Sequence, residues 1–535
     1  MKKTTFLTIC LCFLIIWDCL YAQPLANENK TGLYVRSIDQ ILRLDPDEID
    51  VAIAALIVSE EWSDLVQGRR YQTELEDMAH ELRQRIEEQN LNGSYKAIEI
   101  INSYLFEELG FKSVNKAHKP EDLFLHTVMD NRQGYCLSLS ILYLSIGERL
   151  GLPLYGVVVP SHFFIRYDDG NIQFNIETTA QGGLASDEHY IDKFKVGQVS
   201  RNSLYMKNLN KMQVLGCLFN NLGNVYIEVG NMEKAQLALE RSVQINPTLA
   251  ESHTNLGNVY LKKGMIRNAI MEYESALDIN PNQALIHNNL GNAYLQQGWL
   301  SYAVSQYQHS IRLDPDFLDG YKNLALAYAK DEQLTNAISI LNQAAVINPD
   351  DEEIYVLLGN FYQQNGKYQS AIKEYNKVFY INANSPHAYY GIGNAYIKLD
   401  EVEKGISALE MALQYQPYMA EALTSLGNVF FSQGDYLTAI QYYRKALTSN
   451  PNDKNLHFNL GSAYYNLSDY DNAVLEYTKA VRIDAQMAEA QKGLAMAYLM
   501  LKKFDLAQRH IVTAQKLGAE VSGDILESIN KHITK

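Results

Sequence analysis

The sequence predicts an α+β N-terminal domain followed by an all-α solenoid of helical repeats. A Leu-Gly pair, or a close variant of it, recurs every 34 residues from Leu222-Gly223 to Leu494-Ala495 without an insertion. Self-similarity at such a period is typical of stacked supersecondary units. Before residue 210, three short β-rich runs follow a series of helical patterns. At 535 residues the chain is also too long for one hydrophobic core, so several folded parts are expected.

Residues 1–22 have the pattern of an export signal. Lys2 and Lys3 precede a mostly apolar run of 12 residues, Phe6 to Trp17, and Ala22 offers a small residue before a cleavage site. This run is short against the roughly 20 residues that cross a bilayer. We therefore expect cleavage rather than a retained anchor, no membrane span in the mature chain, and a location in the periplasm or cell envelope.

The charge balance excludes one class of partner. The chain has 46 Lys and Arg against 62 Asp and Glu, a net charge of −16, and no run of basic residues. Binding to a nucleic-acid backbone requires clustered positive charge, so no nucleic acid is expected. The sequence also lacks a phosphate-binding glycine loop with lysine, and its 12 histidines show no metal-ligand spacing. No cofactor and no metal are predicted.

Residues 34–130 are predicted to form the helical first part of the N-terminal domain. Asp45 to Glu60 carries apolar residues at helical spacing, and Tyr71 to Glu88 alternates charges on a helical period. Ala97 to Leu109 is followed by Gly110, which is typical of a helix C-cap.

Residues 131–200 are predicted to form the core of the domain, and residues 201–215 connect it to the repeats. An apolar helix starts at Cys136 and ends before Gly151-Leu152-Pro153. Three predicted strands follow, Leu154–Val159, His162–Tyr167 and Ile172–Glu177, and the stretch from Ser186 to Lys211 is expected to be a linker.

Cys136 is the first candidate for chemistry. At the start of a helix, unpaired N–H groups and the helix dipole favour a thiolate. The alternative is a small buried hydrophobic residue, which is the usual role of a free cysteine. Tyr135, directly before it, is a possible supporting residue, and the N–H of Cys136 is a candidate oxyanion donor.

The last two strands supply candidate partners for the thiol. Asp169-Gly170 favours a two-residue type I′ turn, which places Asp168 opposite Asn171 and His162 opposite Glu177. Directly opposed side chains lie about 5 Å apart at Cβ. The hairpin thus predicts a carboxylate that orients an imidazole, and Asn175 on the same face is a further possible support. A cysteine, a histidine and an orienting acid form the arrangement of a nucleophile with its base.

Four segments resemble the transglutaminase-like superfamily, and are closest to its SirB-type branch: Asn131–Leu139, Leu150–Pro153, Val159–Arg166 and Asn175–Thr179. The resemblance runs from about Ser37 to the first repeat and implies a fold of the papain-like cysteine hydrolase type. It places the superfamily's Cys–His–acid triad on Cys136, His162 and Glu177, with Glu instead of the commoner Asp.

This resemblance implies a cysteine hydrolase or acyltransferase that acts on an amide in a protein or peptide. Some SirB-type members lack the cysteine. The alternative is therefore a catalytically inactive domain within an interaction scaffold.

Residues 216–521 resemble nine tetratricopeptide repeats, and residues 522–535 are expected to form a capping helix. Each 34-residue unit has Gly or Ala at position 8, an aromatic at position 11 and Ala or Gly at position 20, and most have Pro at position 32. The resemblance implies two antiparallel helices per unit and a right-handed superhelix with a concave groove.

Asparagines recur at positions 6 and 9 of the first helix of the units. In the resembled fold these positions face the groove, and a side-chain amide can both donate and accept a hydrogen bond. We therefore expect a protein or extended peptide in the groove and a path by which the groove delivers it to Cys136. The predicted groove residues are Asn221, Asn224, Asn255, Asn258, Asn289, Asn292 and Asn323.

Overall fold

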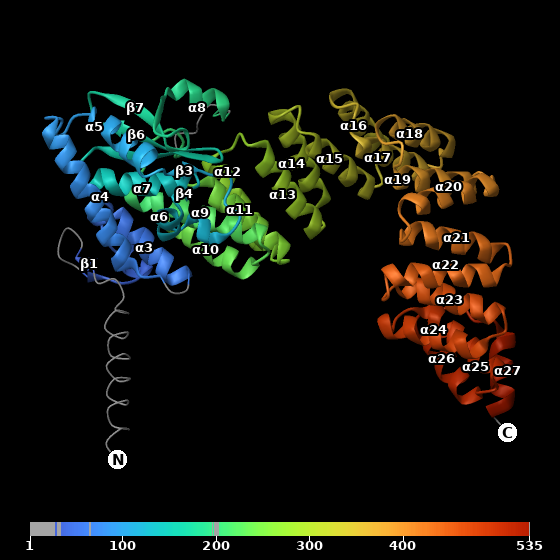
Figure 1. The fold of residues 1–535 in the computed structure, drawn as a ribbon. Coiled ribbons are helices and arrows are strands. Elements are labelled where there is room, and N and C mark those ends of the chain that lie inside the picture. The colour runs from blue at the N-terminus through green and yellow to red at the C-terminus, as the bar shows by residue number, and fades with distance from the viewer. Residues whose placement is uncertain (1–26, 29–33, 64–65, 195, 197–202, 534–535) are drawn as a thin grey trace, which may run out of the picture. The chain divides into compact units, whose positions relative to one another are not determined.

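The structure is a computed structural model that describes residues 27–28, 34–63, 66–194, 196 and 203–533. The predicted signal at residues 1–22 lies outside the described residues. The chain forms two compact units, Met1–Pro315 and Asp316–Lys535 (Figure 1). The first unit therefore contains the α+β domain and three of the helical repeats, so the compact units do not divide at the start of the repeats. Among the described helices, none is both long enough and apolar enough to cross a bilayer.

The helical first part of the domain agrees with the predicted pattern, with one shifted start. The first long helix begins at Val51 rather than near Asp45, because Asp50 caps it by accepting a hydrogen bond from the N–H of Ile53 at 3.0 Å. A separate 3₁₀ turn takes up residues 46–48. The helices are α2 (Ile38–Ile41), α3 (Val51–Trp62), α4 (Gly68–Glu88), α5 (Ala97–Asn102), which continues as a π-helical turn over Ser103–Glu108, and α6 (Leu125–Asn131).

The core of the domain is a buried helix packed on a four-stranded antiparallel sheet. Helix α7 (Cys136–Arg149) is buried along nearly its whole length. The sheet has the order β5-β6-β7-β8. Its strands are β5 (Leu154–Val159), β6 (His162–Asp168), β7 (Gln173–Glu177) and β8 (Gly183–Ala185), of which only β8 was not predicted. Two further short strand pairs are β1 (Asn27–Glu28) with β2 (Tyr34–Val35) and β3 (Lys112–Ser113) with β4 (Gln133–Gly134).

The predicted register of the β6–β7 hairpin is wrong. Asp168 faces Gln173 rather than Asn171, so the loop has four residues instead of two. The cause is Asp169, whose carboxylate accepts hydrogen bonds from the N–H groups of Asn171 and Ile172, both at 2.8 Å, and so stabilises a longer turn. Each residue of β6 therefore faces a residue of β7 that lies two positions further along the chain than predicted. Because side chains alternate between the two faces of a sheet with a period of two, a shift of two residues leaves every side chain on its predicted face. His162 and Glu177 consequently keep their shared face and meet diagonally.

The stretch expected to be a linker is partly structured. Residues of this stretch form helix α8 (Asp187–Lys193), which packs Tyr190 on Phe164 of β6 with ring centroids 3.7 Å apart. Further on, Tyr205 and Leu209 form bridges with Val158 and Gly156 of β5. The connection to the repeats therefore lies along the edge of the sheet.

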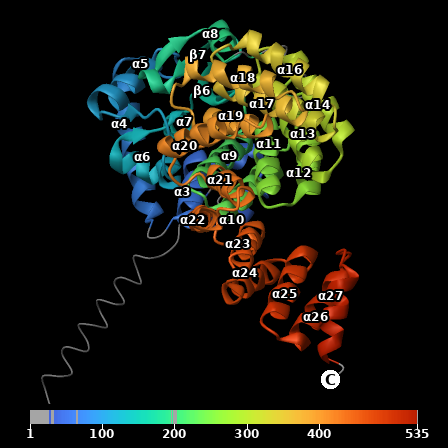
Figure 2. The same cartoon turned by 90° about the vertical axis from the view of Figure 1, so that its right-hand side faces the viewer.

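Eighteen described helices, α9 to α26, form nine antiparallel pairs, and each pair is one repeat. Figures 1 and 2 show α9, α11 and α13 following one another in order within the first unit. Helix α9 starts at Lys211, five residues before the predicted boundary, because Asn210 caps it. The pairs of the first unit are α9 (Lys211–Glu228) with α10 (Met232–Ile245), α11 (Ala250–Lys262) with α12 (Ile266–Ile279), and α13 (Ala284–Gln297) with α14 (Leu300–Leu313).

The second unit continues with six pairs and a terminal helix. The side chains of Ile525 and Leu526 on α27 pack on a cluster that includes Ile511, so this helix covers the apolar face at the end of the last repeat. The helices are α15 (Leu318–Lys330), α16 (Leu334–Ile347), α17 (Glu352–Gln364), α18 (Tyr368–Ile381), α19 (Pro386–Lys398), α20 (Val402–Tyr415), α21 (Ala420–Ser432), α22 (Tyr436–Ser449), α23 (Lys454–Asn466), α24 (Tyr470–Ile483), α25 (Ala488–Met500), α26 (Phe504–Lys516) and α27 (Gly523–Ile533).

In seven of the nine repeats, a glycine at position 8 allows close contact between the two helices. A Cβ added at Gly359 would lie 2.3 Å from Cε1 of Tyr375 on the second helix of the same repeat. We expect Gly359→Ala to destabilise the second unit by about 1–3 kcal/mol, because the tyrosine ring must move in a packed interface. Urea unfolding of the full chain measures this change.

A second substitution serves as the control. Repeat four has Ala325 at the glycine position and Leu341 at the tyrosine position. Adding Tyr375→Leu to Gly359→Ala should therefore recover part of the lost stability, giving a coupling energy between the two sites. Purely additive losses would show that the glycine is not required by this ring.

Candidate functional site

Cys136 is the first residue of α7, and its position is fixed by the local hydrogen bonds. The hydroxyl of Ser138 accepts a hydrogen bond from the N–H of Tyr135 at 2.9 Å, which closes the first turn. The side chain of Cys136 is buried, with 4% of the residue exposed. Its backbone N–H belongs to the first turn, where no intrahelical partner exists.

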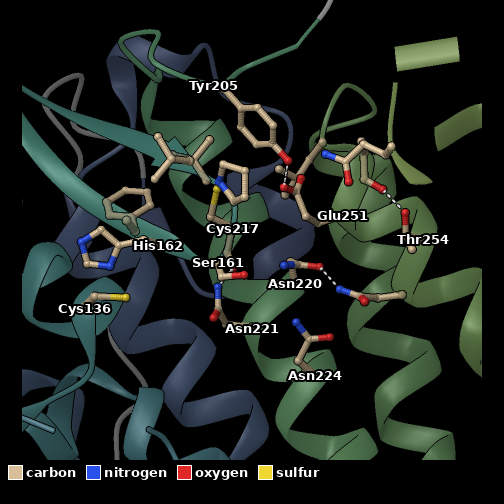
Figure 3. A pocket seen from close by; sticks show the side chains of 18 of the residues that line it. Cys136, Ser161, His162, Tyr205, Cys217, Asn220, Asn221, Asn224, Glu251 and Thr254 are labelled. Carbon is tan, nitrogen blue, oxygen red and sulfur yellow. Dashed lines mark hydrogen bonds between the residues drawn. The ribbon is translucent and has the colours of Figure 1, made fainter. Parts of the chain in front are cut away.

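His162 and Glu177 come together at the ends of two neighbouring strands. His162 is the first residue of β6, and Glu177 is the last residue of β7. The Nε2 atom of His162 lies 2.7 Å from Oε2 of Glu177. Figure 3 shows Cys136 beside the His162 ring. The structure therefore brings together the three residues that the sequence singled out, although the predicted register was wrong.

The carboxylate of Glu177 is held by four hydrogen bonds. Besides His162, the Tyr190 hydroxyl donates to Oε2 at 3.0 Å, and the N–H and hydroxyl of Thr179 donate to Oε1 at 3.0 and 2.5 Å. Burial by itself raises the pKa of Glu177. The hydrogen bond and charge of His162, together with the bonds from Thr179, outweigh burial and lower the pKa to about 2. Glu177 is thus ionised at neutral pH.

The imidazole of His162 has a raised pKa. Burial alone lowers it, but hydrogen bonding and charge interactions with Cys136 and Glu177 together raise it to about 9. The ring is also clamped by Phe194, which stacks on it with centroids 4.9 Å apart and planes 6° from parallel. His162 is therefore an oriented imidazolium at neutral pH.

Thr178 connects the acid strand to the cysteine helix. Its hydroxyl donates to the backbone carbonyl of Cys136 at 3.4 Å and lies 3.1 Å from the hydroxyl of Ser140. Because Thr178 follows Glu177 directly, this buried contact ties the end of β7 to the start of α7.

Tyr135 lies against the thiol, as its place in the sequence suggested. Burial raises the pKa of its hydroxyl, and a hydrogen bond and charge interaction with Cys136 raise it further. The phenol therefore stays protonated and can donate a hydrogen bond beside the sulfur atom.

Asn175 does not support His162 directly, so this part of the prediction is corrected. Its Oδ1 accepts from Nε of Arg166 at 2.8 Å, and its Nδ2 donates to Asp187 at 2.6 Å. Arg166 in turn pairs with Asp187 at 2.7 Å. The cause is the register shift, which places Asn175 directly opposite Arg166. Asn175 thereby fixes the start of α8 rather than the imidazole.

The thiol, the imidazole and the first repeats line one pocket of about 350 Å³. Figure 3 shows this pocket with Cys136 and His162 on one side and residues of α9 and α11 on another. Three of the predicted groove residues line it, namely Asn221, Asn224 and Asn255. The first unit therefore joins the candidate nucleophile to the repeats in one cavity.

The remaining groove asparagines correct the prediction of a continuous peptide-binding ladder. Asn258 accepts from the Tyr273 hydroxyl at 2.7 Å and from Nδ2 of Asn289 at 3.1 Å. Asn292 accepts from the Tyr307 hydroxyl at 2.7 Å. These amide oxygens hold the helices of the repeats together, because a half-buried amide requires a partner. Asn323 belongs to the second unit.

Sequence reasoning missed four residues around the site. Tyr190 and Phe194, which cover His162, lie four residues apart in the stretch taken as a linker, and this helical spacing was the available signal. Tyr205 and Glu251 line the pocket, where the Tyr205 hydroxyl donates to Oε1 of Glu251. Burial raises the pKa of Glu251. No local pattern marks Tyr205 or Glu251, because the two residues lie 46 positions apart in the sequence and meet only in the folded chain.

A buried cysteine helix, an antiparallel sheet with a His–acid pair, and stacked helix pairs define the class: a papain-like α+β domain followed by a helical-repeat solenoid. Comparison with known families agrees with this class. Residues 69–218 match the model of the transglutaminase-like superfamily. Models of tetratricopeptide repeats match residues 223–264, 263–298, 288–352, 427–468 and 455–487, and a model of anaphase-promoting complex subunit 3 matches residues 330–412. The chain consists of a transglutaminase-like domain followed by tetratricopeptide repeats.

Curated relatives cover the N-terminal domain. A UPF0162 protein of Xylella fastidiosa (strain 9a5c) is 27% identical over 212 residues, which are 38% of this chain and 73% of the relative. The UPF0162 protein YchA of Escherichia coli (strain K12) is 29% identical over 157 residues, 28% of this chain and 57% of that protein. F-box only protein 21 of Mus musculus is 33% identical over 106 residues, 19% of this chain and 16% of that protein.

Solved structures are similar to part of the chain. The APC/C hetero-tetramer Cut9–Hcn1 is matched with a TM-score of 0.38 and 13% identity, covering 60% of this chain and 76% of that chain. A tetratricopeptide repeat protein from Parabacteroides merdae ATCC 43184 is matched with a TM-score of 0.40 and 19% identity, covering 46% and 98% of the two chains.

Proposed function

We propose that the protein is a cysteine-dependent hydrolase or acyltransferase that acts on an amide of a protein or peptide. The observation that carries this proposal is the 2.7 Å contact between His162 and Glu177, with His162 and Cys136 both lining one pocket. Cysteine, oriented histidine and acid are the parts that nucleophilic catalysis by a thiol requires.

The roles follow from the atoms that are already engaged. Because Nε2 of His162 is bonded to Glu177, Nδ1 is the ring nitrogen that exchanges a proton with the thiol. The sulfur of Cys136 attacks the amide carbonyl carbon, and the carbonyl oxygen takes the negative charge. The N–H of Cys136 and the Tyr135 hydroxyl are the donors proposed for this oxyanion.

The next steps release the two products. The C–N bond breaks as His162 gives its proton to the leaving amine, which leaves a thioester on Cys136. Water then attacks the thioester carbonyl while His162 takes one proton from the water, and the C–S bond breaks to release the acid and leave Cys136 as a thiolate beside the protonated His162. An amine in place of water gives acyl transfer by the same route. The repeats are proposed to bind the protein substrate or a partner, and residues 1–22 to export the chain.

The alternative is an inactive domain in an interaction scaffold, and the 4% exposure of Cys136 favours it because inert structural cysteines are buried. A direct test separates the two. The full chain is incubated with a protein digest, quenched in acid and searched by mass spectrometry for a hydroxylamine-sensitive acyl group on Cys136. We expect the adduct in the wild type and none in Cys136→Ser. Absence of any adduct and of any amide turnover would favour the scaffold.

Adding methylamine to the same reaction separates hydrolysis from transfer. A transferase would convert product acids into methylamides, and a hydrolase would not.

A further inference from the structure

An internal comparison of the repeats singles out Asn224. In four other repeats, the asparagine at position 9 accepts a hydrogen bond from a tyrosine hydroxyl at position 24 of the same repeat, at 2.7 or 2.8 Å. These pairs are Asn258–Tyr273, Asn292–Tyr307, Asn360–Tyr375 and Asn428–Tyr443. The asparagine at this position is therefore normally part of the helix packing.

The first repeat lacks both of the donors that engage this asparagine elsewhere. Leu239 stands at the position of the tyrosine. In the second and seventh repeats, the position-6 asparagine of the following repeat also donates to the position-9 oxygen. Here the corresponding Asn255 turns to Asn220 instead, at 3.0 Å. Within the described residues, the Asn224 side chain has no hydrogen-bond partner.

This unengaged amide lies in the pocket of the candidate nucleophile. Asn224 is half-buried and lines the same cavity as Cys136 and His162, and Figure 3 shows it on α9 at the pocket wall. Among the described residues that line the pocket, none is a lysine or arginine. Apart from His162 and Glu251, their polar side-chain groups are amides, hydroxyls and thiols. Such a wall suits a neutral polar ligand that both donates and accepts hydrogen bonds.

We propose that Asn224 binds the main chain of an extended peptide substrate in the pocket, with Oδ1 accepting from a peptide N–H and Nδ2 donating to a peptide carbonyl. The proposal deepens the proposed function, because the peptide bound there is the substrate of Cys136. The proposal assigns recognition of the peptide near the thiol to the first repeat, because its Asn224 takes no part in the packing of the helices.

The sixth repeat provides a matched control. Asn394 also has a leucine, Leu409, at the tyrosine position, and it lies in the second unit and does not line this pocket. Asn394→Ala thus makes the same chemical change next to the same kind of neighbour. The substitution Leu239→Tyr is the converse test. It supplies the tyrosine hydroxyl that donates to the asparagine Oδ1 in four other repeats, and so should occupy Asn224 without removing it.

The test measures binding without thiol chemistry. The full chain carrying Cys136→Ala is titrated with N-acetyl-trialanine N-methylamide, an extended main chain with minimal side chains, by ligand-observed NMR. Asn224→Ala is expected to raise Kd about tenfold, as the loss of a pair of hydrogen bonds predicts. Leu239→Tyr is expected to raise Kd similarly, while Asn394→Ala and Leu409→Tyr leave Kd unchanged.

The outcomes are decisive in either direction. An unchanged Kd in Asn224→Ala, an equal effect of Asn394→Ala, or no binding of the peptide by the parent chain would overturn the proposal. If Leu239→Tyr does not fold, Asn224→Ala alone decides. Failure of the proposed function appears separately, as an unreactive Cys136 in a chain that still binds the peptide through Asn224.

Discussion

Cys136 is expected to react with iodoacetamide at neutral pH at least about a hundredfold faster than Cys217. The two thiols line the same pocket but have different neighbours. Burial and the charge of Glu251 raise the pKa of Cys217, so its thiolate is scarce. Cys136 instead lies beside the imidazole of His162, which can take the proton of the thiol during the reaction.

His162→Ala should slow the labelling of Cys136 by roughly 10²-fold, the lower end of the range for a positioned base. Labelling is measured for each cysteine by mass spectrometry of the digested protein, with Cys217→Ser as the control that leaves Cys136 alone in the pocket. Equal and slow labelling of both cysteines, unaffected by His162→Ala, would remove the case for a thiol enzyme.

The second large effect is expected from Glu177→Gln. The substitution keeps the shape of the side chain but removes the charge that stabilises the imidazolium. Turnover should fall by about 10²–10⁴-fold, the range seen when the acid of such a triad becomes an amide. The pKa of His162 should move from about 9 down toward its ordinary value, because one of its two charged partners is lost.

The same variant should change how stability depends on pH. Glu177 has a pKa lowered to about 2, so its contribution to stability is complete above its ordinary value of 4.5 and is lost as pH falls through 2. His162 has a raised pKa, so its contribution is complete below 6.5 and is lost as pH rises through 9. The destabilisation by Glu177→Gln should therefore be largest between pH 4.5 and 6.5 and should shrink above pH 9.

Thermal unfolding across pH and NMR titration of the His162 ring check these expectations. Glu251→Gln is the matched control, since it makes the same change at a glutamate that lines the pocket and accepts a hydrogen bond from Tyr205 instead of contacting His162. A His162 pKa that stays near 9 in Glu177→Gln would show that the carboxylate is not the cause of the shift.

Much of the site could be predicted because it depends on short-range patterns. The alternation of side chains along a strand put His162 and Glu177 on one face, and that result does not change when the register moves by two residues. The register itself could not be predicted, because Asp169 stabilises a longer turn than its Asp-Gly pair suggested. The misplacement of Asn175 follows from the same error.

The residues that cover the imidazole were missed for a different reason. Tyr190 lies in the short helix α8 and Phe194 directly follows this helix. Their helical spacing does not show which surface they cover, because that depends on Phe164 and His162 of the sheet, on which they stack. The asparagine columns were visible in the sequence. The role of these asparagines in packing was not visible, because the tyrosines that donate hydrogen bonds to four of the asparagines lie on the other helix of each repeat.

The sequence by itself determined that the larger part of this chain is a stack of 34-residue helix pairs, and that one cysteine, one histidine and one glutamate stand apart from it. The 34-residue period depends only on residues within each repeat, and nine successive copies make it evident in the sequence. Only the tertiary structure shows that the cysteine and the histidine share a pocket with the first repeats, that Tyr190 and Phe194 cover the imidazole, and that the Asn224 side chain has no hydrogen-bond partner among the described residues. These three features depend on contacts between segments that lie far apart in the chain, and such contacts are fixed only when the folded chain packs.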